Sequence, residues 1–302
     1  AYEGRNEDVV PCLRCNKCHV AGPGNWNTVC SVNPEWGLEH KIERLVTPPK
    51  RAKKVAVVGG GPAGMEAALL LSRRGHSVAL YEKAGRLGGL LNATEGIDIK
   101  WTLLRFRDYM IRQIEKSAVD VHLNTAADSA LLEQEGYDEV VVAIGAQTAY
   151  PPIPGVHGAQ VIPAVELVAR ECELGHQVIV VGGGEIGVEM GLHLAKRGHT
   201  VTVLEMGSIL SPESVPVHFR SLFEHAWETQ EGFSYRLNAR VTAISPDSVT
   251  YVDQEGAEHT LPSQGVVLAA GLTPRQEEAM AFMDGRVRTH MIGDCSQVGS
   301  VQ

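Results

Sequence analysis

The distribution of apolar and polar positions along the chain contains one unit written twice. From Lys53, an apolar and β-branched run at 54–58 leads into a glycine-rich turn, an apolar helix and a second apolar run at 77–81. The same order recurs from Gln177. A strand, a tight turn, a helix and another strand predict a βαβ unit with parallel strands. We therefore expect an α/β protein with two similar domains.

Glycines occupy matching positions in the two units, in the spacing G-x-G-x-x-G. The first glycine permits a tight turn, the second lets the backbone approach a pyrophosphate, and the third lets the helix pack closely on the strand. Each second strand ends at a glutamate placed to hydrogen-bond ribose hydroxyls. The residues are Gly59, Gly61, Gly64 and Glu82 in the first unit and Gly182, Gly184, Gly187 and Glu205 in the second. Because 182 minus 59 and 205 minus 82 both equal 123, the sequence predicts two Rossmann-like dinucleotide-binding domains.

The first unit carries further small and basic residues that favour a permanently bound FAD. A second glycine-rich turn with a basic side chain follows Glu82, and short strands at 139–142 and 289–292 end in small residues. Asp294, after the last of these strands, is expected to take a ribityl hydroxyl of the flavin. The residues expected at the FAD site are Gly59, Gly61, Pro62, Ala63, Gly64, Glu82, Lys83, Arg86, Gly88, Gly89, Ala143, Gly145, Gly293 and Asp294.

The second unit is expected to bind NAD(H). Glu205 is followed by Met206, Gly207 and Ser208, with no Lys or Arg nearby in the sequence to receive a 2'-phosphate. A glutamate at this position repels the extra phosphate of NADP. The residues expected at the NAD(H) site are Gly182, Gly184, Glu185, Ile186, Gly187 and Glu205.

Four of the six cysteines, Cys12, Cys15, Cys18 and Cys30, lie in the first tenth of the chain. Their spacing, C-x2-C-x2-C-x11-C, is typical of a tight loop that turns three thiolates onto an iron-sulfur cubane while a distant cysteine closes the fourth corner. Structural zinc more often takes two separated C-x2-4-C pairs, and disulfide frameworks suit small secreted proteins. The pattern favours an iron-sulfur cluster, and zinc stays open as the alternative.

Proline and glycine between the two units indicate how the domains are connected. Pro151, Pro152, Pro154 and Gly155 are interpreted as a linker. Expected strands at 239–244, 249–253 and 266–270 finish the second domain, and the strand at 289–292 rejoins the first. The prediction is an iron-sulfur segment at 1–48, an FAD domain at 49–148 and 273–302, and an NAD(H) domain at 149–272 inserted within it.

Composition and charge exclude several function classes. The 302 residues are 44% hydrophobic and 21% charged, as in ordinary globular proteins. A formal net charge of -9 leaves no basic surplus for nucleic acid. No run approaches the ~18 apolar residues of a membrane span, and the first ten residues lack a signal-peptide core. A cytoplasmic protein is expected. Because the chain enters the cysteine segment directly and stops soon after a Gly-Asp-Cys turn, we expect a larger parent protein.

The combination of cofactors predicts an electron relay. A nicotinamide gives two electrons as hydride, an iron-sulfur cluster accepts one at a time, and a flavin can do both. Electrons are thus expected to pass from NADH to FAD, then to the cluster and to an acceptor outside this sequence. Hydride transfer to a flavin needs stacking and orientation, so no catalytic side chain is nominated.

Three other classes compete with the relay. A stand-alone pyridine-nucleotide-disulfide reductase needs a redox cysteine pair near the flavin, but residues 85–145 contain no cysteine. An electron-transfer subunit, like the NADPH-side partner of glutamate synthase, would serve a separate catalytic chain. A zinc-tethered nucleotide-binding protein would do no redox work.

The chain resembles the C-terminal half of the enzymes that join an old-yellow-enzyme-like barrel to a glutathione-reductase-like module: 2,4-dienoyl-CoA reductase, 2-enoate reductase and trimethylamine dehydrogenase. The resemblance covers nearly the whole chain and is carried by EGRNEDVVPCLRCNKC, VVGGGPAGMEAA with RLGG, AIGA, VVGGGEIGVE, and AAGLTPR with IGDC.

This resemblance implies that Cys12, Cys15, Cys18 and Cys30 carry a 4Fe-4S cluster that passes electrons to FMN in an N-terminal TIM barrel. It also implies FAD or ADP at the first fingerprint. The expected parent activity is NADH-driven reduction of an activated C=C bond, with a homo-oligomeric full-length form and an FMN barrel domain or separate catalytic chain as partner. The alternative is amine oxidation of the trimethylamine dehydrogenase type, with outward electron flow.

Overall fold

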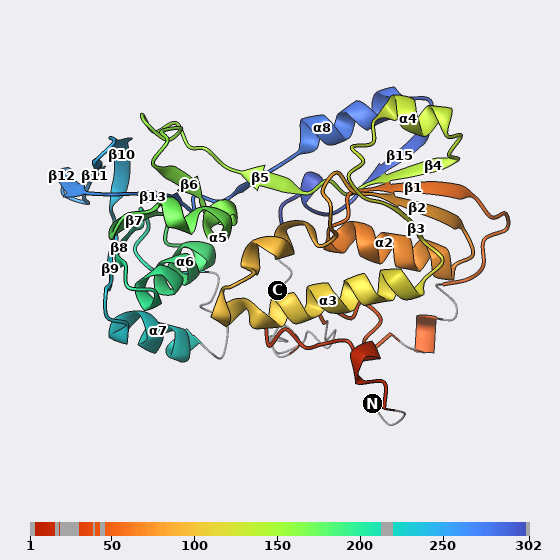
Figure 1. The fold of residues 1–302 in the computed structure, drawn as a ribbon, viewed down its shortest axis with the longest axis horizontal. Coiled ribbons are helices and arrows are strands. Elements are labelled where there is room, and N and C mark those ends of the chain that lie inside the picture. Colours follow the sequence, from red (N-terminus) through yellow and green to blue (C-terminus); the bar gives the residue numbers. More distant parts are fainter. Residues whose placement is uncertain are drawn as a thin grey trace. The chain divides into compact units, whose positions relative to one another are not determined.

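The computed structural model of the chain describes residues 4–15, 18, 30–38, 40–42, 46–212 and 220–299 (Figure 1). The chain forms two units: unit 1 comprises Ala1–Glu95, Lys100–Gln147 and Thr273–Gln302, and unit 2 comprises Gly96–Ile99 and Thr148–Leu272. The segment 1–48, expected as a part of its own, falls within unit 1. The crossings lie at 147/148 and 272/273, where we expected 148/149 and 272/273.

Unit 1 is built on a five-stranded parallel sheet in the order β15-β4-β1-β2-β3. In the central strand, Val58 is level with Tyr81 of one neighbour and Val142 of the other. The carboxyl ends of these strands therefore meet at one edge of the sheet. The strands are β1 (Lys54–Val58), β2 (Ser77–Tyr81), β3 (Asp120–His122), β4 (Glu139–Val142) and β15 (Arg288–Met291).

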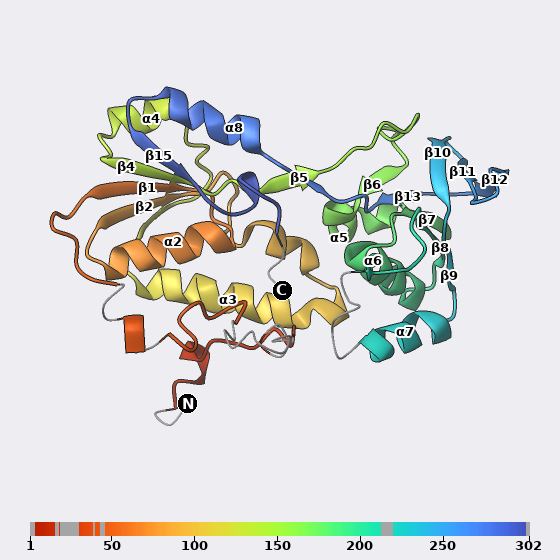
Figure 2. The same cartoon turned by 180° about the vertical axis from the view of Figure 1, so that it is seen from behind.

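Helices cover both faces of this sheet, because alternate residues of each strand point to opposite faces. Val57 packs with Phe106 and Met110 of one helical layer, whereas Ala56 packs with Leu132 of the other. Figure 2 shows α2 and α3 on one side of the strands and α4 and α8 on the other. The helices are α2 (Pro62–Arg73), α3 (Trp101–Lys116), α4 (Ser129–Gln134) and α8 (Gln276–Met280).

Unit 2 repeats the parallel sheet but covers it differently. Its strand order is β6-β13-β7-β8-β9. Val178 and Val180 face a core formed with helices, whereas Ile179 and Val181 face a core formed with a three-stranded antiparallel sheet. The elements are β6 (Val161–Pro163), β7 (Gln177–Val181), β8 (Thr200–Leu204), β9 (Phe233–Arg236), β13 (Val266–Leu268), α5 (Leu167–Arg170), α6 (Glu185–Lys196), α7 (Arg220–Thr229), β10 (Arg240–Ile244), β11 (Ser248–Val252) and β12 (Glu258–Pro262).

The proline-rich segment interpreted as a linker lies within unit 2 and packs there. The Pro154 carbonyl accepts a hydrogen bond from Ile244 N at 2.8 Å, and a Cβ on Gly155 would lie 1.8 Å from Ile244 O. Val156 is 5% exposed in the core beneath β10. The chain crosses before this segment, where β5 (Ala146–Thr148) pairs with β14 (Leu272–Pro274).

The predicted α/β class with two Rossmann-like domains is confirmed by the two parallel sheets. The strand expected at 266–270 ends earlier, at Leu268, because Ala269 and Ala270 pack against the glycine turn that begins at Gly182. Among the residues described, no helix has the length and apolar character needed to cross a bilayer.

A short excursion, Gly96–Ile99, leaves unit 1 and joins unit 2. Ile97 is 2% exposed there and packs in the helical core of unit 2. We expect Ile97→Ala to lower the free energy of unfolding by about 2–4 kcal/mol, because it leaves a cavity in this core. Ile99→Ala is the matched control: this side chain is 40% exposed, and the expected change is within about 0.5 kcal/mol. Urea unfolding measures both, and equal effects would contradict the packing of Ile97.

Candidate functional site

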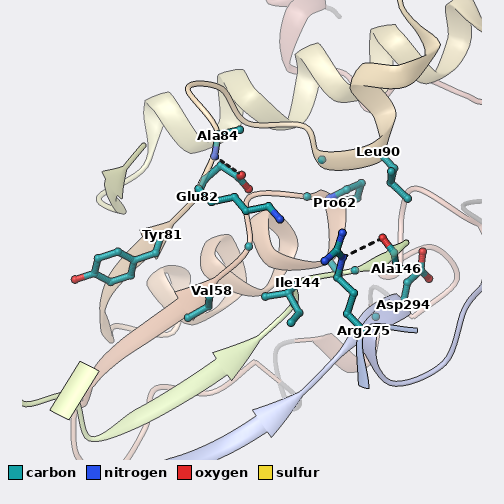
Figure 3. A pocket seen from close by; sticks show the side chains of 18 of the residues that line it. Val58, Pro62, Tyr81, Glu82, Ala84, Leu90, Ile144, Ala146, Arg275 and Asp294 are labelled. Carbon is teal, nitrogen blue, oxygen red and sulfur yellow. Dashed lines mark hydrogen bonds between the residues drawn. The ribbon is translucent and has the colours of Figure 1, made fainter. Parts of the chain in front are cut away.

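A cavity of about 620 Å³ opens in unit 1 at the carboxyl ends of β1, β2 and β4 (Figure 3). Ligands of open parallel sheets bind outside these strand ends. The volume lies within the range of small-molecule and cofactor sites. Its wall is formed by the turn after β1, the segment after β2, the turn after β4 and the C-terminal return of the chain.

The glycine turn after β1 has no room for side chains. Gly59 has a φ of +110°, and a Cβ there would lie 2.3 Å from Ala143 O. A Cβ on Gly64 would lie 1.8 Å from Gly59 O. Helix α2 can therefore begin directly after the strand, with Gly61 as its N-cap and Pro62 in the first turn.

Glu82 is locked at the end of β2 by the backbone of this turn. The side chain is buried, its Oε2 accepts a hydrogen bond from Gly60 N at 2.7 Å, and its Oε1 accepts one from Ala84 N at 2.8 Å. Each carboxylate oxygen has a second lone pair, which can accept a ribose hydroxyl. Figure 3 shows Glu82 at the wall of the cavity.

Most residues predicted for the FAD site lie together in the wall of this cavity. They are Gly59, Gly61, Pro62, Ala63, Glu82, Lys83, Arg86, Gly89, Ala143, Gly145, Gly293 and Asp294. Gly64 and Gly88 do not line it. Gly64 lies beneath the turn, and Gly88, with a φ of +119°, approaches Asn92 and Arg107, so a Cβ there would lie 2.5 Å from Asn92 Oδ1.

Arg86 lines the cavity while bound to a carboxylate of its own segment. Its Nη1 donates to Glu95 Oε2 at 2.8 Å, and Arg107 donates to Glu95 Oε1 at 2.6 Å. These hydrogen bonds, from Arg107 first and then Arg86, hold the pKa of Glu95 below its usual range. The Arg86 guanidinium at the cavity wall is thus paired with an ionised carboxylate.

Sequence reasoning missed one side of the cavity. Arg275, Glu278 and Phe282 line it from the return segment, α8 and the 3-10 turn after α8, and residues 125–127 line it from the loop after β3. The signal for Arg275 was present in the motif AAGLTPR, but no local pattern placed that motif beside the turn after β4. The sheet order does so, because the chain returns to unit 1 next to β4.

The turn after β7 in unit 2 repeats the first turn contact for contact. A Cβ on Gly182 would lie 2.4 Å from Ala269 O, and one on Gly187 would lie 1.9 Å from Gly182 O. Glu205 accepts hydrogen bonds from Gly183 N and Gly207 N, both at 2.6 Å. The two Gly-x-Gly turns therefore have the same physical basis.

The remaining residues predicted for the second site lie at the start of α6. Gly184 is its N-cap, Glu185 is its first residue, and Ile186 is 40% exposed. Arg236, which ends β9, is a neighbour of Glu205 that sequence spacing did not indicate: its carbonyl accepts from Glu205 N at 2.9 Å. Its guanidinium donates to Tyr235 O at 2.9 Å. The backbone of an arginine therefore lies beside Glu205 across the sheet, which the linear sequence does not indicate.

None of the four N-terminal cysteines forms a disulfide, and the segment around Cys12 and Cys15 is anchored to the core of unit 1. Leu13 is 7% exposed in the core that includes Leu87 and Leu91, and Cys15 packs against the same core. Cys15 Sγ lies 3.3 Å from Ser31 Oγ, so the chain folds back and brings Cys15 near the residue that follows Cys30.

Four cysteine thiols are suitable ligands for a metal cluster, but the described residues do not show these thiols converging on one point. Within 4–15, 18, 30–38 and the other described ranges, no three His, Cys, Asp or Glu side chains form a group able to hold a metal ion. Residues 16–17 and 19–29, between the cysteines, lie outside the described part. Arg14 has a φ of +60°, its N–H donates to Cys12 Sγ at 3.3 Å, and its guanidinium lies 4.8 Å from the Trp101 ring centre.

Two parallel-sheet units with matching glycine turns and locked glutamates define a protein that binds two dinucleotides. Residues 53–291 match the family described as pyridine nucleotide-disulphide oxidoreductase, and the chain belongs to this family. The family implies binding of FAD and NAD(H), and the chain is an NAD(P)H-dependent flavoprotein oxidoreductase.

Curated relatives agree with this class. The chain is 36% identical to a bilirubin reductase of Mediterraneibacter gnavus (98% of this chain, 45% of the relative) and 32% identical to an NADH oxidase of Thermoanaerobacter brockii (100% and 47%). It is 35% identical to a cinnamate reductase of Clostridium sporogenes (82% and 39%). The chain thus spans slightly less than half the length of these relatives.

A solved structure of 2-naphthoyl-CoA reductase in complex with 2-naphthoyl-CoA matches 99% of this chain and 46% of its own, with a TM-score of 0.92 and 29% identity. Together with the curated relatives, this match confirms the resemblance to the C-terminal half of the 2,4-dienoyl-CoA reductase, 2-enoate reductase and trimethylamine dehydrogenase family.

Alanine at the third glycine of each turn tests which site binds which cofactor. We expect Gly64→Ala to remove FAD from the purified protein, because its Cβ collides with Gly59 O. Gly187→Ala, with the equivalent collision at Gly182 O, should leave FAD bound and slow flavin reduction by nicotinamide at least tenfold. Flavin absorbance and stopped-flow reduction measure the two effects. Equal loss of FAD in both variants would contradict this assignment.

Proposed function

We propose that this chain is the electron-input module of an NADH-dependent flavoenzyme. In this proposal, the unit 2 turn binds NAD(H), the unit 1 cavity binds FAD, and four cysteines hold a 4Fe-4S cluster that leads to an acceptor outside the chain. The observation that carries the proposal is the contact-for-contact repeat of the two turns, the first of which opens into a cavity of about 620 Å³.

FAD, when bound, supplies the exchange between hydride and single-electron transfer. The work of the chain is to bind and orient. The N-terminus of α2 and the glycine turn bind the pyrophosphate, Glu82 accepts a ribose hydroxyl, and Asp294 accepts a ribityl hydroxyl. In unit 2, Glu205 accepts the ribose hydroxyls of the nicotinamide dinucleotide, which favours NADH over NADPH.

Disulfide reduction is the activity in the family's description, but the cavity supports a different reaction. No cysteine is present among the described residues that line it. Cys295, which follows Asp294, is buried, and its Sγ is 3.1 Å from Ile292 O. Its described lining therefore offers no thiol pair of the kind that a disulfide reductase needs, and one-electron transfer through the N-terminal cysteines accounts better for the four thiols.

The cysteine loop and the cavity share one hydrophobic core in unit 1. Leu13 lies between Cys12 and Cys15, and its core partners Leu87 and Leu91 flank Gly89 and Leu90 of the cavity wall. Four thiols of this spacing match the ligand set of a 4Fe-4S cluster. A cluster held by Cys12, Cys15, Cys18 and Cys30 would therefore sit on the same structural unit as the flavin.

We propose reduction of an activated C=C bond as the activity of the whole protein. The support is the similarity to a cinnamate reductase and to 2-naphthoyl-CoA reductase, because cinnamate carries a double bond conjugated to its carboxylate. The final acceptor of this chain's electrons would be FMN, in a barrel domain or in a separate catalytic chain.

Anaerobic titration of the full-length protein with NADH tests the relay. We expect flavin absorbance to bleach first and cluster absorbance to follow, because hydride enters at the flavin and the cluster accepts single electrons. NADPH should reduce the flavin at least tenfold more slowly at equal concentration. An absence of bleaching with NADH would refute NADH as donor, and a preference for NADPH would overturn the assignment based on Glu205.

Metal and sulfide analysis tests the cluster. We expect about four iron and four sulfide per chain, and Cys15→Ser should lose most of the iron while keeping FAD. Cys172→Ser is the matched control, because this exposed cysteine lies in unit 2 and its loss should leave the iron content unchanged. A colourless preparation that contains zinc would contradict the relay and indicate a structural zinc site instead.

A further inference from the structure

Arg275 presents a guanidinium to the unit 1 cavity from the segment where the chain re-enters this unit. It follows β14 directly, precedes α8 and lines the cavity with Ala146 and Asp294. Figure 3 shows its side chain reaching into the cavity beside Ala146, on the side where Pro62 begins α2. Neither the glycine turns nor the acidic strand ends include this residue.

Hydrogen bonds from both sides hold Arg275 against the cavity wall. Its backbone N donates to Gly145 O at 3.2 Å, and its Nε donates to Ala146 O at 3.4 Å. Its Nη1 donates to the two carboxylate oxygens of Glu278 at 2.9 and 3.2 Å. Arginine has five N–H donors, and Nη2 makes no hydrogen bond within the described part of the chain. A fixed guanidinium with an unused edge therefore faces the cavity, with its side chain 25% exposed.

Most other charged groups of the cavity are already engaged or opposite in sign to Arg275. Glu82 accepts two backbone N–H groups, Arg86 donates to Glu95, and Asp294 accepts from Gly299 N at 3.0 Å. Glu278 accepts from Arg275 itself, and Lys83 is a second cation, on the segment after β2. Arg275 is thus a rigidly held cation on the return segment, whereas the α2 N-terminus belongs to the first turn.

We propose that Arg275 binds the pyrophosphate of the dinucleotide held in unit 1, donating from Nη2 to a phosphate oxygen. This inference rests on the proposed FAD site and adds to it a ligand from a distant part of the chain. The chemistry favours phosphate over the flavin ring: a guanidinium and a helix N-terminus both bind phosphate oxygens. A pyrophosphate between them would be neutralised from two sides.

Binding of ADP and FAD to the apo form of the full-length protein tests the proposal, because ADP carries the pyrophosphate without the flavin. We expect Arg275→Gln to weaken both ligands about tenfold, as for one lost charge-assisted hydrogen bond. The salt dependence of both affinities should become shallower, since one cation is removed from the site. Arg275→Lys should retain most of the ADP affinity.

Arg288→Gln is the matched control, since it removes one positive charge from the exposed first residue of β15 in the same unit, outside the cavity wall. Unchanged ADP affinity in Arg275→Gln, or a change equal to that of the control, would overturn the proposal. Weaker FAD binding with normal ADP binding would assign Arg275 to the flavin half and overturn it as well. A lowered unfolding temperature of the apo-protein that Arg275→Lys does not restore, together with lost ADP binding, would identify a structural residue instead. If the unaltered protein binds neither ligand, the FAD site itself fails.

Discussion

Both nucleotide turns depend on how closely a helix can approach the strand before it. In each turn, a Cβ on the third glycine would lie less than 2 Å from the carbonyl oxygen of the first, at 1.8 Å for Gly64 and 1.9 Å for Gly187. No side chain fits in that space, so α2 and α6 start directly at the strand end. The N–H groups of a first helical turn have no partner within the helix, and in dinucleotide-binding proteins they bind phosphate.

The same backbone that makes this turn also orients the acidic residue of the next strand. Glu82 and Glu205 each accept one hydrogen bond from the residue after the first glycine and another from an N–H two residues beyond the carboxylate. The turn, the strand end and the carboxylate therefore form one connected piece in each unit. At either site, the glutamate carboxylate is therefore already oriented before a ligand binds.

The two units differ in what surrounds the shared turn. In unit 1, helices cover both faces of the sheet, and the chain returns through Arg275 and Asp294 to enclose a cavity. In unit 2, an antiparallel sheet covers one face, and Arg236 of β9 lies beside the strand that ends at Glu205. The same turn thus opens into a cavity in unit 1, whereas in unit 2 Ile186 of the first turn of α6 stays 40% exposed.

The sequence by itself determined the features that arise within about thirty residues: the βαβ units, the glycine turns, Glu82 and Glu205, and the cysteine ligand type. Each follows from local sterics and spacing, because the interacting groups belong to one turn and the strand after it. Only the tertiary structure decided that Arg275 lines the cavity, that Ile97 belongs to unit 2 and that Pro154 packs on β10. These contacts join segments far apart in the sequence, and the order of strands in a sheet, which no local pattern encodes, brings them together.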